Sequence, residues 1–222
     1  MRILVVGMGL IGGSICKSIK AATSHAVYGC DVQQAVLNDA IADGAIDGTG
    51  TMTDSTYDMI ILCLHQRIAI QMVQEALPKI PTGTILVDTC GLKGRMVRDL
   101  TYRCRKAGVR YVGTHPMAGR EKNGYYASIP NLFQNANLIV TPVDGTDEAA
   151  LDTVKELADQ MGFGKIVTAT PMWHDNMIAY TSQLAHVVSS SYVKDFCMDD
   201  ALSFSGGSFQ DMTRVARLNE NM

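Results

Sequence analysis

The sequence has 222 residues, of which 47% are hydrophobic and 18% charged, and its formal net charge is −3. This length suffices for one large domain or for one and a half ordinary ones, with a substantial core. The composition excludes a disordered chain and gives no sign of nucleic-acid binding, so small molecules are the expected partners.

The first predicted strand runs directly into a glycine cluster and then into a helix. Residues 3–14 are ILVVGMGLIGGS, in which Gly7, Gly9 and Gly12 have the G-x-G-x-x-G spacing, and residues 10–19 have a helical pattern. Between a strand and a helix this spacing is typical of a dinucleotide site, because the glycines allow a tight turn, close approach of a pyrophosphate and close helix packing. The residues predicted to contact the cofactor here are Gly7, Met8, Gly9, Leu10, Ile11 and Gly12.

The second predicted strand, HAVYGCD, ends in Asp31, which follows Gly12 by 19 residues. A carboxylate at this place accepts hydrogen bonds from the adenosine ribose, whereas NADP requires a nearby arginine for its 2′-phosphate. No basic residue occurs between Asp31 and Arg67. The sequence therefore predicts NAD as the cofactor; the alternative is a glycine-rich turn in another kind of α/β domain.

Helices and strands alternate through the next part of the chain. The expected helices cover residues 33–42, 68–77 and 95–107, and the expected strands cover residues 59–64, 84–88 and 109–113. Residues 44–53 are expected to form a loop with at most a short strand. The alternation predicts an α/β fold of the Rossmann type, a doubly wound and mostly parallel sheet with its ligand crevice at the C-terminal edge.

Several predicted strands end in polar or small residues that should surround the nicotinamide. Leu64, His65 and Cys90 are candidate cofactor contacts at two of these ends, and His115 follows a third. An enzyme that moves hydride from a carbon bearing a hydroxyl needs a group to take the hydroxyl proton, and histidine titrates near neutral pH. His115 is therefore the candidate base, and a histidine held only by nearby backbone is the alternative.

The chain after His115 is expected to form a loop and then the sheet's last strands. Residues 117–133 form a long loop rich in Gly, Asn and Tyr, which we interpret as a wall of the site with Gly119 as a candidate substrate contact. A strand over 137–141, a helix over 147–161 and a final strand over 165–169, placed at the edge and possibly antiparallel, complete this part.

The strand and helix alternation stops at Thr170, where a helical portion begins. Thr170 and Pro171 are typical of a helix start, and the helix should run to about Phe196. We therefore divide the chain into a NAD-binding Rossmann domain, residues 1–169, and a helical substrate and dimerisation domain, residues 170–222. A last helix, with Ser208 as a plausible N-cap, carries Arg214 and Arg217.

A polar stripe on the long helix holds further candidate residues. Gln183 and His186 recur at helical spacing between apolar flanks, so we expect them to face a cleft as substrate contacts. Arg214 shares a helix face with Gln210 and Arg217, for which a solvated polar face is the default interpretation and a functional role is the alternative. Lys93 could contact a phosphate or carboxylate, or be a solvated loop residue. His174 is expected to be structural, oriented by Asp175.

The six cysteines, among them Cys197, show no C-x-x-C spacing and fall mostly in apolar patterns. This distribution suits reduced thiols in the cytoplasm and no metal site. We expect no signal peptide and no membrane span, because Met1 and Arg2 lead straight into a strand and no apolar run is long enough.

A set of motifs extends in order over nearly the whole chain: GMGLIGGS, DTCGLKG, GTHPMAGREKNGYYAS, NLFQNANLIVTP, WHDNMIAYTSQLAH and GGSFQDMTRVA. Together these motifs resemble the prephenate and arogenate dehydrogenase family of tyrosine biosynthesis. The resemblance implies NAD-dependent oxidative decarboxylation of prephenate to 4-hydroxyphenylpyruvate. It also implies that His115 accepts the hydrogen bond of the ring hydroxyl, that His186 contacts the substrate and that Arg214 binds a substrate carboxylate.

The sequence departs from the family pattern at two places. Many members carry a serine near the ring hydroxyl where Gly91 stands here, so that hydrogen bond is missing or is supplied by Thr89, Thr114 or water. Members also usually continue past the T-R-x-A motif through helices that pair two protomers, which implies a homodimer where those helices are complete; the helical portion here is expected to be shortened.

The sequence leaves other functions open. Arogenate is a competing substrate, because it differs from prephenate only in an amino group in place of a keto group. A dehydrogenase of a small β-hydroxy acid is disfavoured by the HPMAG and T-R-x-A motifs. A catalytically idle NAD(H)-binding sensor is an alternative from another class, suggested by Gly91 and the short C-terminal portion.

Overall fold

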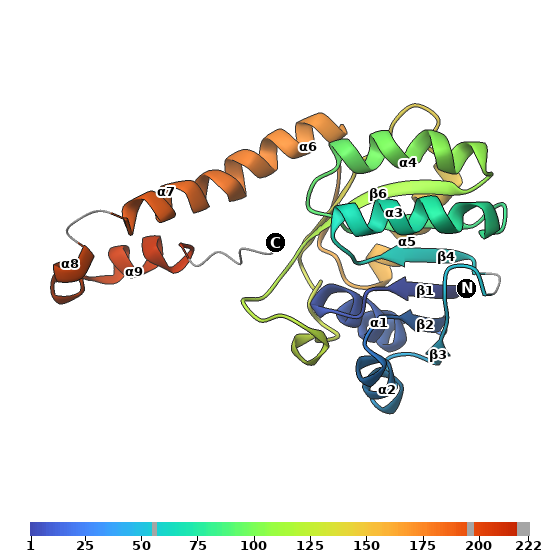
Figure 1. Cartoon of the computed structure of the whole chain (residues 1–222), viewed down its shortest axis with the longest axis horizontal. Coiled ribbons are helices and arrows are strands. Elements are labelled where there is room, and N and C mark those ends of the chain that lie inside the picture. The colour runs from blue at the N-terminus through green and yellow to red at the C-terminus, as the bar shows by residue number, and fades with distance from the viewer. Residues whose placement is uncertain (55–56, 195–197, 217–222) are drawn as a thin grey trace. The chain divides into compact units, whose positions relative to one another are not determined.

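The computed structural model describes residues 1–54, 57–194 and 198–216. The chain divides into two compact units, Met1–His174 and Asp175–Met222 (Figure 1). Arg217 and Cys197 lie outside the described residues, as does the expected end of the long helix near Phe196.

The first unit is built on one sheet, which has eight strands within the described residues, in the order β3-β2-β1-β4-β5-β6-β7-β8. The strands are β1 (Arg2–Val6), β2 (Ala26–Cys30), β3 (Gly48–Thr49), β4 (Met59–Leu62), β5 (Ile85–Asp88), β6 (Arg110–Met117), β7 (Asn137–Val140) and β8 (Lys165–Thr168). Strands β1 to β6 pair in parallel, and their order reverses beside β1. This is the Rossmann order, which places a ligand crevice at the C-terminal ends of β1 and β4, so the predicted fold class is confirmed.

Helices cover both faces of this sheet (Figure 1). They are α1 (Leu10–Ala22), α2 (Gln34–Ala42), α3 (Gln66–Ala76), α4 (Gly94–Lys106) and α5 (Glu148–Gln160), with short 3-10 turns η1 (Leu77–Lys79) and η2 (Tyr125–Ala127). Because successive side chains of a strand point to opposite faces, alternate strand residues build two cores. Helices α1, α2 and α5 cover the face of Ile3 and Val5, and α3 and α4 cover the face of Leu4 and Val6.

Strand β6 is longer than the sequence predicts and changes its mode of pairing along its length. Residues 110–113 pair in parallel with β5, and residues 114–117 pair antiparallel with β7. His115 lies opposite Ile139 in this ladder and is therefore inside a strand. The prediction that it follows the end of a strand was wrong. Strand β8 lies at the sheet edge, as predicted, but it is parallel to β7. The antiparallel pair is β6 with β7, whereas the sequence suggested that β8 could be the antiparallel strand.

The long segment after β6 is held against helices α1 and α2 of the same unit. The Tyr125 hydroxyl donates to Asp43 at 2.9 Å, and the Lys17 ammonium lies 4.5 Å from the centroid of the Tyr125 ring. The backbone N–H of Ile129 donates to Ser14 Oγ at 3.1 Å. These contacts fix the second half of the segment against α1 and α2, whereas Gly119 in its first half is exposed.

The helical portion begins as predicted but is not one uninterrupted α-helix. Thr170 Oγ1 accepts the N–H of Trp173 at 3.2 Å, and Pro171 opens α6 (Pro171–Ile178). A π-helical turn, η3 (Ala179–Gln183), separates it from α7 (Leu184–Tyr192). Such turns occur mostly where an extra residue is inserted into a helix, frequently at functional sites.

The second unit ends with two short helices, α8 (Met198–Phe204) and α9 (Gly207–Arg214). The sequence did not predict α8. Ser208 is not the N-cap of α9, because the helix already begins at Gly207 with Gly206 as its N-cap. Ser189 of α7 is buried and donates to the carbonyl of Met212, which joins α7 to α9.

Candidate active site

The glycine loop lies at the C-terminal end of β1 and has the geometry of an anion cradle. Gly7 has a φ of +93°, and a side chain on it would collide with the carbonyl of Cys63. A side chain on Gly12 would collide with the Gly7 carbonyl, whereas a Cβ on Gly9 would meet nothing within 4 Å. The space in front of Gly9, next to the free N–H groups that open a helix such as α1, therefore suits a pyrophosphate.

Asp31 is held beside this loop by two backbone groups. Its Oδ2 accepts the N–H of Met8 at 2.7 Å, and its Oδ1 accepts the N–H of Gln33 at 2.9 Å. Each carboxylate oxygen still has a lone pair for a further donor. The residues present thus fit a dinucleotide, with its pyrophosphate at Gly9 and its adenosine ribose at Asp31.

The ends of β4 and β5 lie on the other side of the loop. A Cβ on Gly7 would lie 2.8 Å from the Leu64 side chain, so Leu64 is packed against the glycine turn. His65 is exposed and is the N-cap residue of α3. Cys90 is buried and its thiol donates to the Leu64 carbonyl at 3.3 Å; burial raises the pKa of this thiol far above its usual value. Cys90 is therefore a neutral packing residue and no nucleophile.

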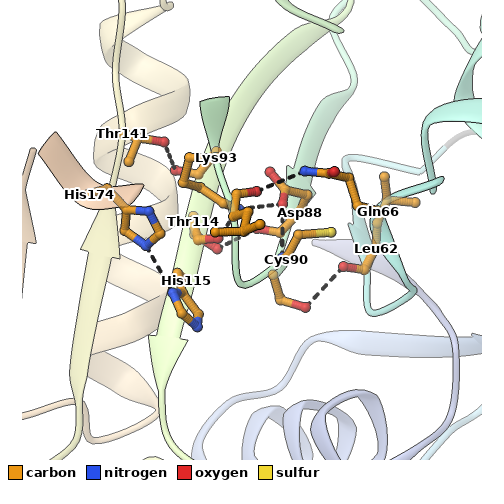
Figure 2. A network of polar contacts seen from close by, with 12 residues as sticks. Leu62, Gln66, Asp88, Cys90, Lys93, Thr114, His115, Thr141 and His174 are labelled. Atoms are coloured by element: carbon orange, nitrogen blue, oxygen red, sulfur yellow. Dashed lines mark hydrogen bonds and ion pairs between the residues drawn. The ribbon is translucent and has the colours of Figure 1, made fainter. Parts of the chain in front are cut away.

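His115 and His174 form a hydrogen-bonded pair (Figure 2). Nδ1 of His115 lies 2.9 Å from Nε2 of His174, and the two rings meet edge to face with centroids 5.1 Å apart. His174 is only 1% exposed, whereas His115 is half-buried. The sequence prediction that Asp175 orients His174 missed this partner. The sequence signal that could have pointed to His174 as the partner of His115 is the WHD motif at the start of α6.

Gly91 lies on the other side of the His115 ring. A Cβ placed on Gly91 would lie 3.8 Å from Nε2 of His115. The two threonines named as substitutes for the family serine donate elsewhere. Thr89 donates to the Leu62 carbonyl at 3.1 Å, and the buried Thr114 donates to the Asp88 carbonyl at 2.7 Å. Neither threonine hydroxyl therefore donates into the space between Gly91 and Nε2 of His115.

A buried ion pair underlies this edge of the sheet (Figure 2). The side chains of Lys93 and Asp88 are both 0% exposed and in contact. The Lys93 ammonium also donates to the Thr114 carbonyl, and Asp88 accepts from the Tyr111 hydroxyl at 2.6 Å. The sequence suggested that Lys93 is a ligand contact or a solvated loop residue, and its burial contradicts both interpretations. Its side chain instead joins the end of β5 to β6 just before His115.

The second unit brings its own candidate residues together. Nδ1 of His186 lies 2.8 Å from the carbonyl oxygen of Val215, the residue after Arg214. Gln183 is the last residue of the π-helical turn, one turn before His186, and both Gln183 and Arg214 are exposed. The imidazole of His186 therefore lies against the backbone of the residue that follows Arg214.

The described ranges show neither a metal site nor a membrane-spanning helix. No group of three or more His, Cys, Asp or Glu side chains there could hold a metal ion. None of the helices in the part of the chain that the structure describes is both long and apolar enough to span a membrane. Within the same residues, five cysteines are free thiols: Cys16, Cys30, Cys63, Cys90 and Cys104.

The strand order, the glycine turn and the carboxylate at the end of β2 define a dinucleotide-binding domain of the Rossmann class. Family models identify it further: residues 15–168 match the nucleotide-binding domain of prephenate dehydrogenase, and residues 170–222 match the dimerization domain of prephenate dehydrogenase. The chain belongs to the prephenate dehydrogenase family.

Individual relatives agree with this assignment. The prephenate dehydrogenase of Bacillus subtilis is 30% identical over 224 residues, covering 96% of this chain and 60% of its own length. The structure of Synechocystis arogenate dehydrogenase has a TM-score of 0.85 at 26% identity, covering 100% of this chain and 81% of that one. The Aquifex aeolicus prephenate dehydrogenase, in complex with hydroxyphenyl propionate and NAD+, has a TM-score of 0.83 at 28% identity, covering 100% and 79%. The chain thus spans about 60% of the length of the curated relative from Bacillus.

Proposed function

We propose that the protein is an NAD-dependent prephenate dehydrogenase, which oxidises and decarboxylates prephenate to 4-hydroxyphenylpyruvate. The observation that carries the proposal is the place of His115. Its ring lies at the same edge of the sheet as the glycine turn, with Nδ1 held by His174 and Nε2 turned to Gly91. Family membership and the NAD+ complex of the Aquifex relative support it.

In this proposal the first unit binds the cofactor and takes a proton. The backbone of Gly7 to Gly12 holds the pyrophosphate, and Asp31 accepts hydrogen bonds from the ribose. NAD, when bound, supplies the acceptor for the hydride that leaves the ring carbon bearing the hydroxyl. Nε2 of His115 accepts the proton of that hydroxyl, which lets the carbonyl form. Carbon dioxide then leaves the opposite ring carbon, the electron pair of the broken C–C bond makes the ring an aromatic phenolate, and the phenolate takes the proton back from His115.

The second unit binds the anionic substrate in this proposal. Arg214 binds a substrate carboxylate through its two parallel N–H groups, because a guanidinium matches a carboxylate in shape and charge. His186 and Gln183 contact the same substrate. The carboxylate that departs as carbon dioxide needs no such partner, since solvation would stabilise it in the ground state.

Arogenate is the second candidate substrate. The Synechocystis arogenate dehydrogenase superimposes on the whole chain with a TM-score of 0.85. Arogenate has the same ring, hydroxyl and departing carboxylate, so the roles of His115 and Arg214 stay the same. Only the side chain differs, with an amino group in place of the keto group.

The test is turnover by the purified protein with NAD and either prephenate or arogenate, following NADH and the aromatic product together. Two variants separate the roles. His115→Asn is expected to lower kcat by about 10²- to 10⁴-fold, the usual contribution of a general base. Arg214→Gln is expected to raise KM for the substrate by roughly 10- to 100-fold, because a charged hydrogen bond is lost. The affinity for NADH should be unchanged in both variants. Tight NADH binding without turnover on either substrate would contradict the proposal and favour a sensor.

The proposal includes a homodimer formed through the helical portion, as the name of the matching dimerization domain suggests. Helix α7 exposes an apolar face with helical spacing: Leu184 is 48% exposed, Val187 60%, Val188 45% and Tyr192 48%. Large apolar side chains gathered on one helix face usually mark an interaction surface. The five free thiols among the residues that the structure describes favour a reducing compartment, the cytoplasm, as the place of action.

A further inference from the structure

The pair of His115 and His174 carries an inference about how the base is prepared, and this inference rests on the proposed function. The nitrogens Nδ1 of His115 and Nε2 of His174 are 2.9 Å apart, a hydrogen-bond distance. Between two neutral imidazoles one proton occupies this line, so one ring donates and the other accepts. The nitrogen that donates determines what His115 presents on its opposite side.

The opposite side of the His115 ring is where Nε2 lies. A Cβ on Gly91 would be 3.8 Å from Nε2 and 3.9 Å from Cε1, and Gly91 itself is exposed. If His174 donated, His115 would carry its proton on Nε2 and would present a donor to this space. If His174 accepts, His115 carries its proton on Nδ1 and presents a lone pair, which is what a base requires.

We propose that His174 is a positioning residue that accepts the Nδ1–H of His115 and thereby leaves Nε2 unprotonated. During the reaction the substrate hydroxyl proton moves to Nε2, and the imidazolium that results keeps its Nδ1–H bond to the His174 lone pair. His174 neither gains nor loses a proton in this step. It fixes the tautomer and the ring orientation of His115, the role that a carboxylate has beside the histidine of a serine protease.

The surroundings of His174 suit this role. Its ring is 1% exposed and its backbone N–H donates to the Thr170 carbonyl at 2.9 Å. Thr170 Oγ1 caps the same turn by accepting from Trp173. His115 is fixed independently by the ladder between β6 and β7. Each imidazole is therefore held by its own element, and little conformational freedom is lost when they bond.

The first test measures the tautomer directly, without substrate or cofactor. Long-range ¹H–¹⁵N correlation spectra of the ¹⁵N-labelled full chain distinguish a protonated from an unprotonated ring nitrogen, and His115→Gln assigns the signals. We expect His115 to be protonated on Nδ1 and unprotonated on Nε2. In His174→Leu, which has no acceptor, we expect the proton to move toward Nε2; in His174→Gln, whose amide oxygen can accept, it should stay on Nδ1.

A parent protein with His115 protonated on Nε2 would overturn the inference, and so would an unchanged tautomer in His174→Leu. The parent spectrum alone is decisive if His174→Leu does not fold. Because no turnover is involved, this failure is distinct from failure of the proposed function, which is absence of turnover in the parent.

The second test is kinetic. His174→Leu is expected to lower kcat by roughly 10- to 100-fold, part of what the base contributes, with KM for NAD within about twofold. His174→Gln should recover most of the lost kcat, because it keeps the acceptor. Equal losses in the leucine and glutamine variants would contradict a role in accepting the Nδ1–H.

Discussion

Gly91 and His115 face each other at a distance that leaves room for a small side chain. A Cβ on Gly91 would lie 3.8 Å from Nε2 of His115, which is ordinary van der Waals contact, and the backbone of Gly91 is not in the left-handed region that favours glycine. The residue is therefore replaceable. It stands where the sequence resemblance places a serine in many family members.

Gly91→Ser is expected to fold normally and to raise kcat by up to about fivefold, because one added hydrogen bond to the reacting hydroxyl is worth about 1 kcal/mol. Gly91→Ala is the control, since it adds the same Cβ without a hydroxyl. Steady-state kinetics with prephenate and NAD measure the effect. Equal rates in the serine and alanine variants would show that a hydroxyl at this position is not used.

Asp31→Asn is expected to change the choice of cofactor. The amide cannot reproduce the charged acceptor, so NADH affinity should fall by roughly 10- to 100-fold. NADPH binding should fall less, because repulsion between the carboxylate and the 2′-phosphate is removed. Fluorescence titration with both reduced cofactors measures this. The control is Asp58→Asn, which removes the charge from a similar acceptor of a backbone N–H, that of Arg2; a parallel loss for both cofactors in Asp31→Asn would contradict the assignment.

Lys93→Met is expected to destabilise the protein by roughly 3–5 kcal/mol, because it leaves the Asp88 carboxylate buried without its cation. Urea unfolding measures the change. The double variant Lys93→Met with Asp88→Asn should lose less, since no uncompensated charge remains. Lys79→Met, which alters an exposed lysine, should stay within about 0.5 kcal/mol. Equal stabilities of the two Lys93 variants would show that the buried charge is not the cause.

The stability of the protein should fall at alkaline pH in part through Cys104. Burial raises the pKa of its thiol from 9.0 to about 12. Above pH 9 the unfolded chain releases this proton while the folded chain keeps it, so this contribution is intact below pH 9 and is lost as pH rises toward 12. At pH 10 the loss is about 1.4 kcal/mol.

Comparison of urea unfolding at pH 8 and pH 10 isolates this effect. The decrease between the two pH values should be smaller by about that amount in Cys104→Ala than in the parent. Val97→Ala, a truncation in the same core, should lower stability equally at both pH values. An identical decrease in Cys104→Ala and the parent would contradict the assignment.

Val187→Asp is expected to weaken self-association, because it places a charge in the apolar face of α7. Sedimentation equilibrium should show a dimer for the parent and a shift to monomer for the variant. Ile68→Asp is the control, since Ile68 is also exposed, at 49%, but lies on α3 in the first unit. Dissociation in the control alone would contradict the proposed interface.

The local sequence was sufficient to predict most of the sheet. Apolar runs such as MIILCL, and helices ended by proline or glycine, predicted β4 and most other elements to within a few residues. The prediction was wrong for the length of β6, because Pro116 is usual only at sheet margins and favoured an end of the strand. Antiparallel pairing with β7 overrode that preference, and such pairing is a long-range contact that local patterns do not contain.

The site could be predicted only in part for the same reason. The glycine turn is a local feature, so its geometry followed from spacing. The contact of His115 with His174 joins residues 59 apart in sequence, and the burial of Lys93 depends on Asp88 and Tyr111 on two neighbouring strands. A lysine in a loop predicts exposure unless its buried partner is known.

The mixed pairing of β6 limits how this part of the chain can change. Its first half takes its register from β5 and its second half from β7, and side chains alternate between the two faces along the whole strand. Adding or deleting one residue between Arg110 and Thr114 would turn the His115 imidazole over to the opposite face of the sheet. The number of residues inside β6 is therefore fixed by its two partner strands.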